Sequence, residues 1–492
     1  MSSKFGWIIV AAGLAPAVLH AATCESLAGL STAKVAVSVA KSEAAGSFQP
    51  PGASRALTGL PAFCRVAVSL RPTTDSDIQA EIWLPTSGWN GKLLAVGSGG
   101  WGGAIGYGAL ADGLRRGYAT VASDDGHESE GASFVVGHPQ KLIDFAYRAE
   151  HDMTVEAKAL VKTFYAHEPS HSYWSGCSGG GREGLLQAAR YPDEFDGVVA
   201  GDPADVRRNA WALSLAVRTF KDPQSRIPPE KYPMIHQAVL AACDAQDGLK
   251  DGLISEPERC HVDFAALECK GADGPTCLTH RQVESARAII SPANSASGKA
   301  LFPRLEPGTE LRWGRLAAGP EPGDLFLDQF RYLVYPDGHW DWRTFDLDRD
   351  AAKAHAINKD VLELNPHLAA FARHGGKLLI YHGWADQQVA PGASIEFYQA
   401  AAGQGPKPAE DWIRLFTAPG MAHCAGGEGP SEFDALGALE HWVEQGSAPA
   451  QILASHRTAG QVDRTRPLCP YPQVARYQGS GSIDDAANFA CR

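Results

Sequence analysis

The sequence predicts an α/β fold in which a mostly parallel sheet is interrupted by an inserted second domain. Short apolar runs such as 92–96 alternate with longer segments such as 143–164, whose apolar residues recur at helical spacing. A strand-like run at 377–382 repeats this pattern late in the chain. From about 203 to 366 the chain instead carries acidic Asp-Gly turns, a Pro/Gly stretch and many aromatic residues. This change of character is typical of a separate domain.

Further elements extend the same pattern. Short apolar runs at 118–123, 172–175 and 197–200 predict strands. The run 182–190 predicts a helix that ends before Pro192. The strand at 92–96 leads into a glycine-rich turn, residues 97–103, which we call the glycine loop.

Composition and charge exclude several classes of protein. The 492 residues include 44 Lys and Arg against 56 Asp and Glu, a formal net charge of -12. This charge disfavours nucleic acid and anionic membrane surfaces as partners. The near-average composition argues against fibrous or largely disordered material.

The N-terminus predicts export. Lys4 is followed by an apolar run over 5–19 and by the small residues Ala21 and Ala22. This is the pattern of a cleaved signal peptide, residues 1–22, so we expect a soluble secreted or periplasmic protein with no membrane span. The alternative is a lipidated Cys24, for which the preceding Thr23 is a poor processing residue.

The cysteines support export. Their number, ten, is even, which in an oxidising compartment suggests five disulfides. A zinc site is the weaker interpretation, because the chain has no Cys-x-x-Cys pair and its cysteines are spread from Cys24 to Cys491.

The pentapeptide 176–180, Gly-Cys-Ser-Gly-Gly, predicts a nucleophile at Ser178. It lies between a predicted strand and a predicted helix, the context of a nucleophile elbow in an α/β-hydrolase fold. Backbone N–H groups at the start of that helix, Gly179 first, can stabilise an oxyanion. The alternative is an ordinary serine in a glycine-rich turn.

A serine nucleophile needs a base and a group that orients the base, expected here in the chain order Ser, acid, His. Asp386 follows the strand at 377–382, and His423 follows another strand-like run. His382 and His127 are the competing bases. The second oxyanion donor is expected from Gly99, Gly100 or Trp101, with Gly100 as our candidate; the alternative is a flexible surface loop.

Two cysteines adjacent to these residues point to a family. Cys177 directly precedes Ser178, and Cys424 directly follows His423. In this the chain resembles the tannase and feruloyl esterase family, which includes mono-hydroxyethyl terephthalate hydrolase and in which a disulfide joins these two cysteines. The resemblance implies an α/β-hydrolase domain over 23–203 and 367–492, with a large inserted lid domain over 204–366. The family's disulfide pattern implies the pairs Cys24–Cys64, Cys177–Cys424, Cys243–Cys260, Cys269–Cys277 and Cys469–Cys491.

An acidic turn in the insertion predicts a metal site. Asp244, Asp247 and Asp251 would repel one another in a tight turn unless a hard cation, best calcium, neutralises them. The alternative is a solvated acidic turn. The resemblance implies a structural calcium held by these side chains and by the carbonyls of Leu249 and Leu253.

The resemblance also implies an acyl pocket in the lid. Trp101 and Arg331 are candidate substrate contacts, together with lid aromatic residues, Phe330 first; the others are Phe326, Tyr332, Trp340 and Trp342. Aromatic residues at this spacing are also typical of a lid core.

These features predict a secreted serine carboxylesterase that cleaves aromatic esters through an acyl-enzyme and needs no redox cofactor. The expected substrate is a small aromatic ester or a feruloylated saccharide, with hydroxycinnamoyl esters first, galloyl esters second and terephthalate monoesters third. The rivals are a serine peptidase or amidase, and a non-catalytic, calcium-stabilised carbohydrate-binding protein.

Overall fold

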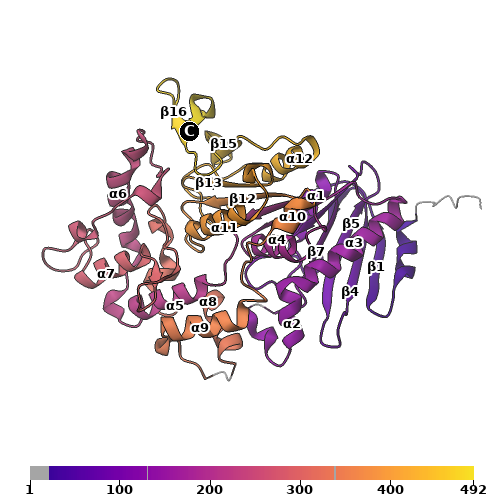
Figure 1. Cartoon of the computed structure of the whole chain (residues 1–492), viewed down its shortest axis with the longest axis horizontal. Coiled ribbons are helices and arrows are strands. Elements are labelled where there is room, and N and C mark those ends of the chain that lie inside the picture. Colours follow the sequence, from indigo (N-terminus) through magenta and orange to yellow (C-terminus); the bar gives the residue numbers. More distant parts are fainter. Residues whose placement is uncertain (1–21, 130, 337–338) are drawn as a thin grey trace, which may run out of the picture.

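A computed structural model describes residues 22–129, 131–336 and 339–492. Its centre is a nine-stranded sheet in the order β1-β4-β5-β7-β6-β8-β9-β12-β13 (Figure 1). The strands are β1 (Val35–Glu43), β4 (Phe63–Leu70), β5 (Ile78–Pro85), β6 (Lys92–Val96), β7 (Ala119–Ser123), β8 (His171–Cys177), β9 (Gly197–Gly201), β12 (Lys377–Gly383) and β13 (Ile413–Ala418). All strands predicted from the sequence belong to this sheet.

The sheet is mixed. β1, β4, β5 and β7 pair antiparallel, whereas every neighbouring pair from β7 to β13 is parallel. The strands β7 and β9 are buried along their whole length, as expected for strands covered on both faces. Because parallel strands align their carboxyl ends, the segments that follow β6, β8, β12 and β13 gather at one edge.

Helices cover both faces of the sheet. They include α1 (Tyr107–Arg115), α2 (Pro139–Ile143), α3 (Ala149–Tyr165), α4 (Gly179–Arg190), α10 (Ala369–Arg373), α11 (Pro391–Gln404) and α12 (Ala435–Gln445). The predicted helix at 143–164 is α3 preceded by a π-helical turn, and the predicted helix at 182–190 begins three residues earlier. Two large apolar clusters, one on each side of the sheet, form the core.

The inserted segment, residues 204–366, forms a helical lobe beside the carboxyl edge of the sheet (Figure 1). It contains α5 (Arg208–Thr219), α6 (Tyr232–Cys243), α7 (His280–Ile289), α8 (Asp324–Asp328) and α9 (Leu347–Asn358), with the short strands β10 (Ala293–Asn294) and β11 (Ala300–Phe302). Most of its buried apolar residues pack among themselves in two clusters. The segment therefore has a core of its own.

Small two-stranded sheets complete the structure. They are formed by β2 (Gly46–Phe48) with β3 (Leu57–Leu60), β14 (Ile452–Thr458) with β15 (Gln461–Leu468), and β16 (Ala475–Tyr477) with β17 (Phe489–Cys491). Five disulfides pair all ten cysteines as the family pattern implied. Cys24 is bonded to Cys64, which disfavours its lipidation.

Two expectations concern the chain ends and membranes. The predicted signal peptide, residues 1–22, lies almost wholly outside the described residues. Among the residues that the structure describes, no helix has the length and apolar character to cross a membrane.

Candidate active site

Ser178 lies at the turn between β8 and α4. Its φ of 61° is in the left-handed region, which is rare for a residue with a side chain and marks a strained turn. The Ser178 carbonyl accepts hydrogen bonds from the N–H groups of Arg182 and Ala204, so the turn is fixed from two sides. Gly176 is required here, because a Cβ at this position would come within 2.5 Å of the Gly180 carbonyl. The predicted elbow is present.

The glycine loop lies against the N-terminus of α4. The Gly180 N–H donates to the Ser98 carbonyl over 2.6 Å. A Cβ on Gly179 would meet the Gly100 nitrogen at 3.3 Å. The backbones of Gly179 and Gly100, the two candidate oxyanion donors, are therefore neighbours.

His423 and Asp386 form the second half of the site. His423 Nδ1 is 2.7 Å from Asp386 Oδ2, and Asp386 Oδ1 accepts the N–H groups of Gln388 and Val389. Asp386 is fully buried, which favours its neutral form, but the interactions with His423 and His382 outweigh burial and hold the pKa of Asp386 well below its usual range. Asp386 is therefore a carboxylate that fixes the orientation of the His423 ring.

A disulfide joins the two halves. Cys177 and Cys424 are bonded, with their Cα atoms 5.9 Å apart and a sequence separation of 247. Ser178 and His423 are the immediate neighbours of these cysteines, so the covalent bond brings the serine turn and the histidine loop together. The sequence predicted this juxtaposition.

Comparisons with known proteins show the family of the chain. The family model for tannase and feruloyl esterase matches residues 64–323 and 326–492. The chain belongs to the tannase and feruloyl esterase family. It is therefore a carboxylic ester hydrolase.

Individual relatives cover nearly the whole chain. An uncharacterized esterase of Xanthomonas campestris pv. campestris is 37% identical over 96% of this chain and 91% of its own. A probable feruloyl esterase B-2 of Neosartorya fischeri is 34% identical over 87% of this chain and 86% of its own. The crystal structure of feruloyl esterase B from Aspergillus oryzae superposes with a TM-score of 0.90 at 32% identity, covering 95% of this chain and 99% of that one.

Two buried residues of this family member, to which the sequence assigned no positioning role, contact Asp386 or the loops that carry Asp386 and His423. Asp202 is fully buried and accepts the N–H groups of Gly383 and Cys424. His382, considered only as a competing base, is also fully buried; its Nε2 is 3.2 Å from Asp386 Oδ2 and its Nδ1 2.8 Å from Ser394 Oγ. Both residues tie the loops of the site together, and only their tertiary contacts reveal this.

Burial shifts the charge states of this pair. Burial raises the pKa of Asp202 to about 6, although the nearby His382 opposes the shift. Burial favours the neutral imidazole of His382, but Asp202 and Asp386 outweigh it and raise the pKa of His382.

The other competing base, His127, has its pKa lowered by burial, and its Nε2 is 2.7 Å from the Trp101 carbonyl. His127 therefore anchors the glycine loop.

The inserted segment contacts the glycine loop of this esterase directly. Trp101 Nε1 donates to the Leu325 carbonyl over 3.1 Å, and the Leu325 side chain lies 3.8 Å from where a Cβ on Gly100 would be. Trp101 itself is buried. The segment thus lies over the predicted oxyanion loop.

The other predicted substrate contacts have partners within the inserted segment. Phe330 is fully buried and packs on Trp340 and Phe345. Arg331 forms an ion pair with Asp324, with an N–O distance of 2.8 Å. Phe326 and Trp342 are buried as well. Phe326, Phe330 and Trp342 thus pack inside the inserted segment, and a substrate contact by Phe330 or Arg331 stays a prediction.

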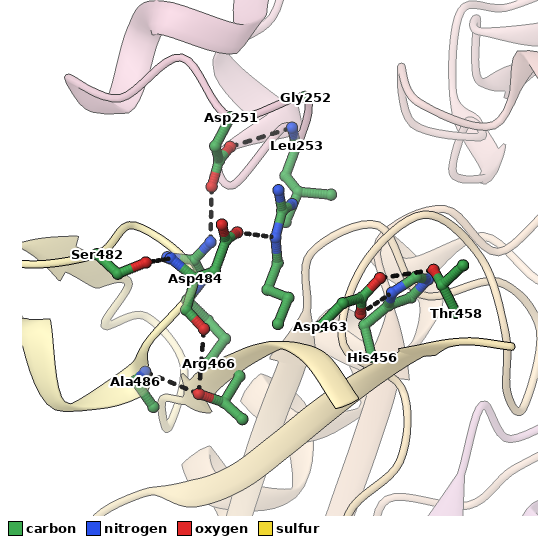
Figure 2. Close-up of polar contacts among 12 residues, drawn as sticks. Asp251, Gly252, Leu253, His456, Thr458, Asp463, Arg466, Ser482, Asp484 and Ala486 are labelled. Carbon is green, nitrogen blue, oxygen red and sulfur yellow. Dashed lines mark hydrogen bonds and ion pairs between the residues drawn. The ribbon is translucent and has the colours of Figure 1, made fainter. Parts of the chain in front are cut away.

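The acidic turn of the insertion has the oxygen ligands that calcium takes. Asp244 accepts the N–H groups of Asp251 and Gly252, and Asp247 accepts that of Leu249. Figure 2 shows Asp251 between the Leu253 N–H and the Arg466 guanidinium, 2.7 Å away.

The donor chemistry of this turn fits calcium, but the geometry is not that of a closed site. In the part of the chain that the structure describes, the ligand atoms of Asp244, Asp247 and Asp251 do not all lie within 4.8 Å of one another. Arg466 supplies a positive charge to one of them. The calcium site stays a prediction.

Proposed function

We propose that this esterase cleaves esters of aromatic carboxylic acids with Ser178 as nucleophile, His423 as general base and Asp386 as the group that orients His423. The observation that carries the proposal is the covalent link between the serine turn and the histidine loop, combined with the His423–Asp386 hydrogen bond. A hydroxyl is a weak nucleophile unless a positioned base takes its proton.

The reaction follows from this arrangement. With Nδ1–H donating to Asp386, His423 Nε2 is free to accept the Ser178 proton as Oγ bonds to the ester carbonyl carbon. The N–H groups of Gly179 and Gly100 stabilise the oxyanion. The imidazolium then protonates the leaving alcohol, and water, activated by the same histidine, releases the acid and restores the Ser178 hydroxyl.

The substrate class rests on the relatives. The proteins matched over most of the chain include feruloyl esterases B, so hydroxycinnamoyl esters, free or on a saccharide, are the first candidates. Galloyl esters and terephthalate monoesters follow. The inserted segment acts as a lid that lines the acyl site, because its Leu325 contacts the glycine loop.

Two further features complete the proposal. Five disulfides suit an oxidising compartment, so the protein is exported. The acidic turn at 244–253 holds a structural calcium through carboxylate and carbonyl oxygens.

The test is a comparison of rates. Wild-type protein should turn over methyl ferulate faster than methyl gallate and mono-hydroxyethyl terephthalate, and Ser178→Ala should abolish turnover of all three. A peptide amide should not be cleaved. Activity retained by Ser178→Ala refutes the mechanism, and a preference for the gallate or the terephthalate ester reassigns the substrate.

A further inference from the structure

A chain of buried carboxyl groups lies beneath the glycine loop. Asp125 follows β7, Glu150 belongs to α3 and Glu183 to α4; we call these three residues the acid cluster. Their exposed fractions are 1%, 2% and 0%, and one oxygen from each lies within 4.8 Å of the others. Nothing in the triad chemistry uses them.

Ser98 connects this cluster to the glycine loop. Its N–H donates to Glu183 Oε2 over 3.0 Å, and its hydroxyl oxygen lies 2.9 Å from Glu183 Oε1 and 2.5 Å from Asp125 Oδ2. The Ser98 carbonyl in turn accepts the Gly180 N–H at the start of α4. Two carboxyl groups thus hold Ser98, which precedes Gly100 by two residues.

Asp125 also supports the far end of the loop. A Cβ on Gly102 would come within 2.0 Å of Asp125 Oδ2, so the carboxyl group packs directly against the backbone there. The Gly102 N–H donates to the Gly99 carbonyl, which closes the turn that contains Gly100. Displacement of the acid cluster would therefore move the Gly100 N–H.

The hydrogen bonds at Ser98 are best satisfied by a proton within the cluster. A hydroxyl has one hydrogen to donate, whereas an ionised carboxylate only accepts. The Ser98 hydroxyl contacts two carboxyl oxygens, so if both groups were ionised one contact would join two lone pairs. Both contacts are hydrogen bonds when one carboxyl group keeps its proton and donates it to Ser98 Oγ.

The charges around the cluster act in both directions. Arg182, whose Nη2 is 3.7 Å from Glu183 Oε1, favours the ionised form of Glu183, and His127 faces Asp125. Burial, reinforced by the charge of Asp125, outweighs Arg182 and raises the pKa of Glu183 to about 7. Burial and the charges of Asp125 and Glu183 raise the pKa of Glu150 well above its usual value.

We propose that Glu183 and Asp125 are positioning residues that hold Ser98, and with it the Gly100 oxyanion donor, through a proton that the two carboxyl groups share. This inference rests on the proposed role of Ser178. It assigns a function to the Glu183 side chain, which lies in the first turns of α4 after the nucleophile and contacts Ser98 of the glycine loop.

Three variants and a control test the positioning. Ser98→Ala and Glu183→Ala remove the anchor. Glu183→Gln keeps it, because the amide accepts the Ser98 N–H and donates to Ser98 Oγ as a neutral acid does. Glu156→Gln makes the same change at a half-buried acid of α3 that contacts no part of the site. The substrate is 4-nitrophenyl acetate, whose turnover does not depend on the identity of the natural acyl group.

Loss of the anchor should weaken the stabilisation of the transition state. Because removal of an oxyanion donor costs about 100-fold or more in kcat, its displacement in Ser98→Ala and Glu183→Ala should cost about tenfold, with KM nearly unchanged. Phenylboronic acid, a mimic of the tetrahedral intermediate, should lose affinity by the same factor. Glu183→Gln should stay within about threefold of wild type, and Glu156→Gln should not differ from it.

Each outcome decides a part of the proposal. Wild-type kcat in Ser98→Ala overturns the anchoring. A Glu183→Gln protein as slow as Glu183→Ala overturns the shared proton. If Glu183→Ala does not fold, the infrared spectrum decides: wild type at pH 6 should show a neutral carboxylic acid band that Glu183→Gln removes or shifts, and its absence overturns the proton. Full activity in a parallel Ser178→Ala protein instead refutes the proposed function on which the inference rests, whatever the result at Ser98 and Glu183.

Discussion

Asp386 meets the demands on a triad acid through its two oxygens. Oδ1 accepts two backbone N–H groups from the loop beyond β12, and Oδ2 faces both His423 and His382. A carboxylate with this many donors stays ionised even though it is buried. The loop backbone therefore fixes the acid, and the acid fixes the ring of His423.

Asp386→Asn should remove this control with little change in shape. The amide nitrogen can face His423 Nδ1 and hold the proton on Nε2, where the ring can no longer act as base. We expect kcat on methyl ferulate to fall about 10⁴-fold, as for the equivalent change in other Ser-His-Asp triads. The measurement is steady-state kinetics. Asp193→Asn, at an exposed acid, is the control, and a loss of less than tenfold in Asp386→Asn would show that another group orients the base.

At the scale of elements, the disulfide between the serine turn and the histidine loop is the feature that most directly sets the site. Replacement of Cys177 and Cys424 by serine should lower kcat, because proton transfer depends on the separation that this bond constrains. We also expect a loss of about 2–4 kcal/mol in the free energy of unfolding.

A second disulfide provides the matched control. Cys269–Cys277 lies in the inserted segment and closes a short loop with a sequence separation of 8. Its replacement by serine also removes one covalent bond but should leave kcat unchanged. Equal kcat in both double variants and wild type would mean that the Cys177–Cys424 bond does not position the triad.

The acidic turn of the inserted segment yields a prediction about metal removal. Calcium bound only to the folded state raises the free energy of unfolding by about 2.7 kcal/mol at a free concentration 100 times Kd. A chelator should therefore lower the melting temperature, and added calcium should restore it. Asp247→Asn should weaken this response and Asp193→Asn should not. Identical melting curves with and without chelator would contradict a bound calcium at this turn.

The sequence predicted those elements that are specified locally. The strands of the parallel sheet, the serine elbow and the order of Ser178, Asp386 and His423 follow from short patterns whose spacing carries the information. Asp202 and Glu183 were missed because their partners lie on other elements, brought close only by folding. The role of Phe330 stays a prediction for a related reason, since the spacing of aromatic residues does not distinguish the core of the inserted segment from the wall of a substrate pocket.

At the scale of the whole molecule, the acid cluster links stability to pH. Burial raises the pKa of Glu183 from 4.5 to about 7, so between these values the folded protein keeps a proton that the unfolded chain has released. The free energy of unfolding then falls as pH rises through this window. For Glu183, which has no solvent exposure, the shift corresponds to a fall of roughly 3 kcal/mol.

Glu183→Gln removes this dependence, because the amide does not titrate. In urea unfolding experiments from pH 4.5 to 8, the variant should gain stability relative to wild type as pH rises, by up to roughly 3 kcal/mol near neutral pH. Groups with a lowered pKa, such as Asp386, make the folded protein more stable as pH rises. They are present in both proteins, so their contributions cancel in the comparison. Glu156→Gln should show a smaller change, since that acid is only half-buried. Parallel curves for Glu183→Gln and wild type would contradict a proton held by Glu183 in the folded protein.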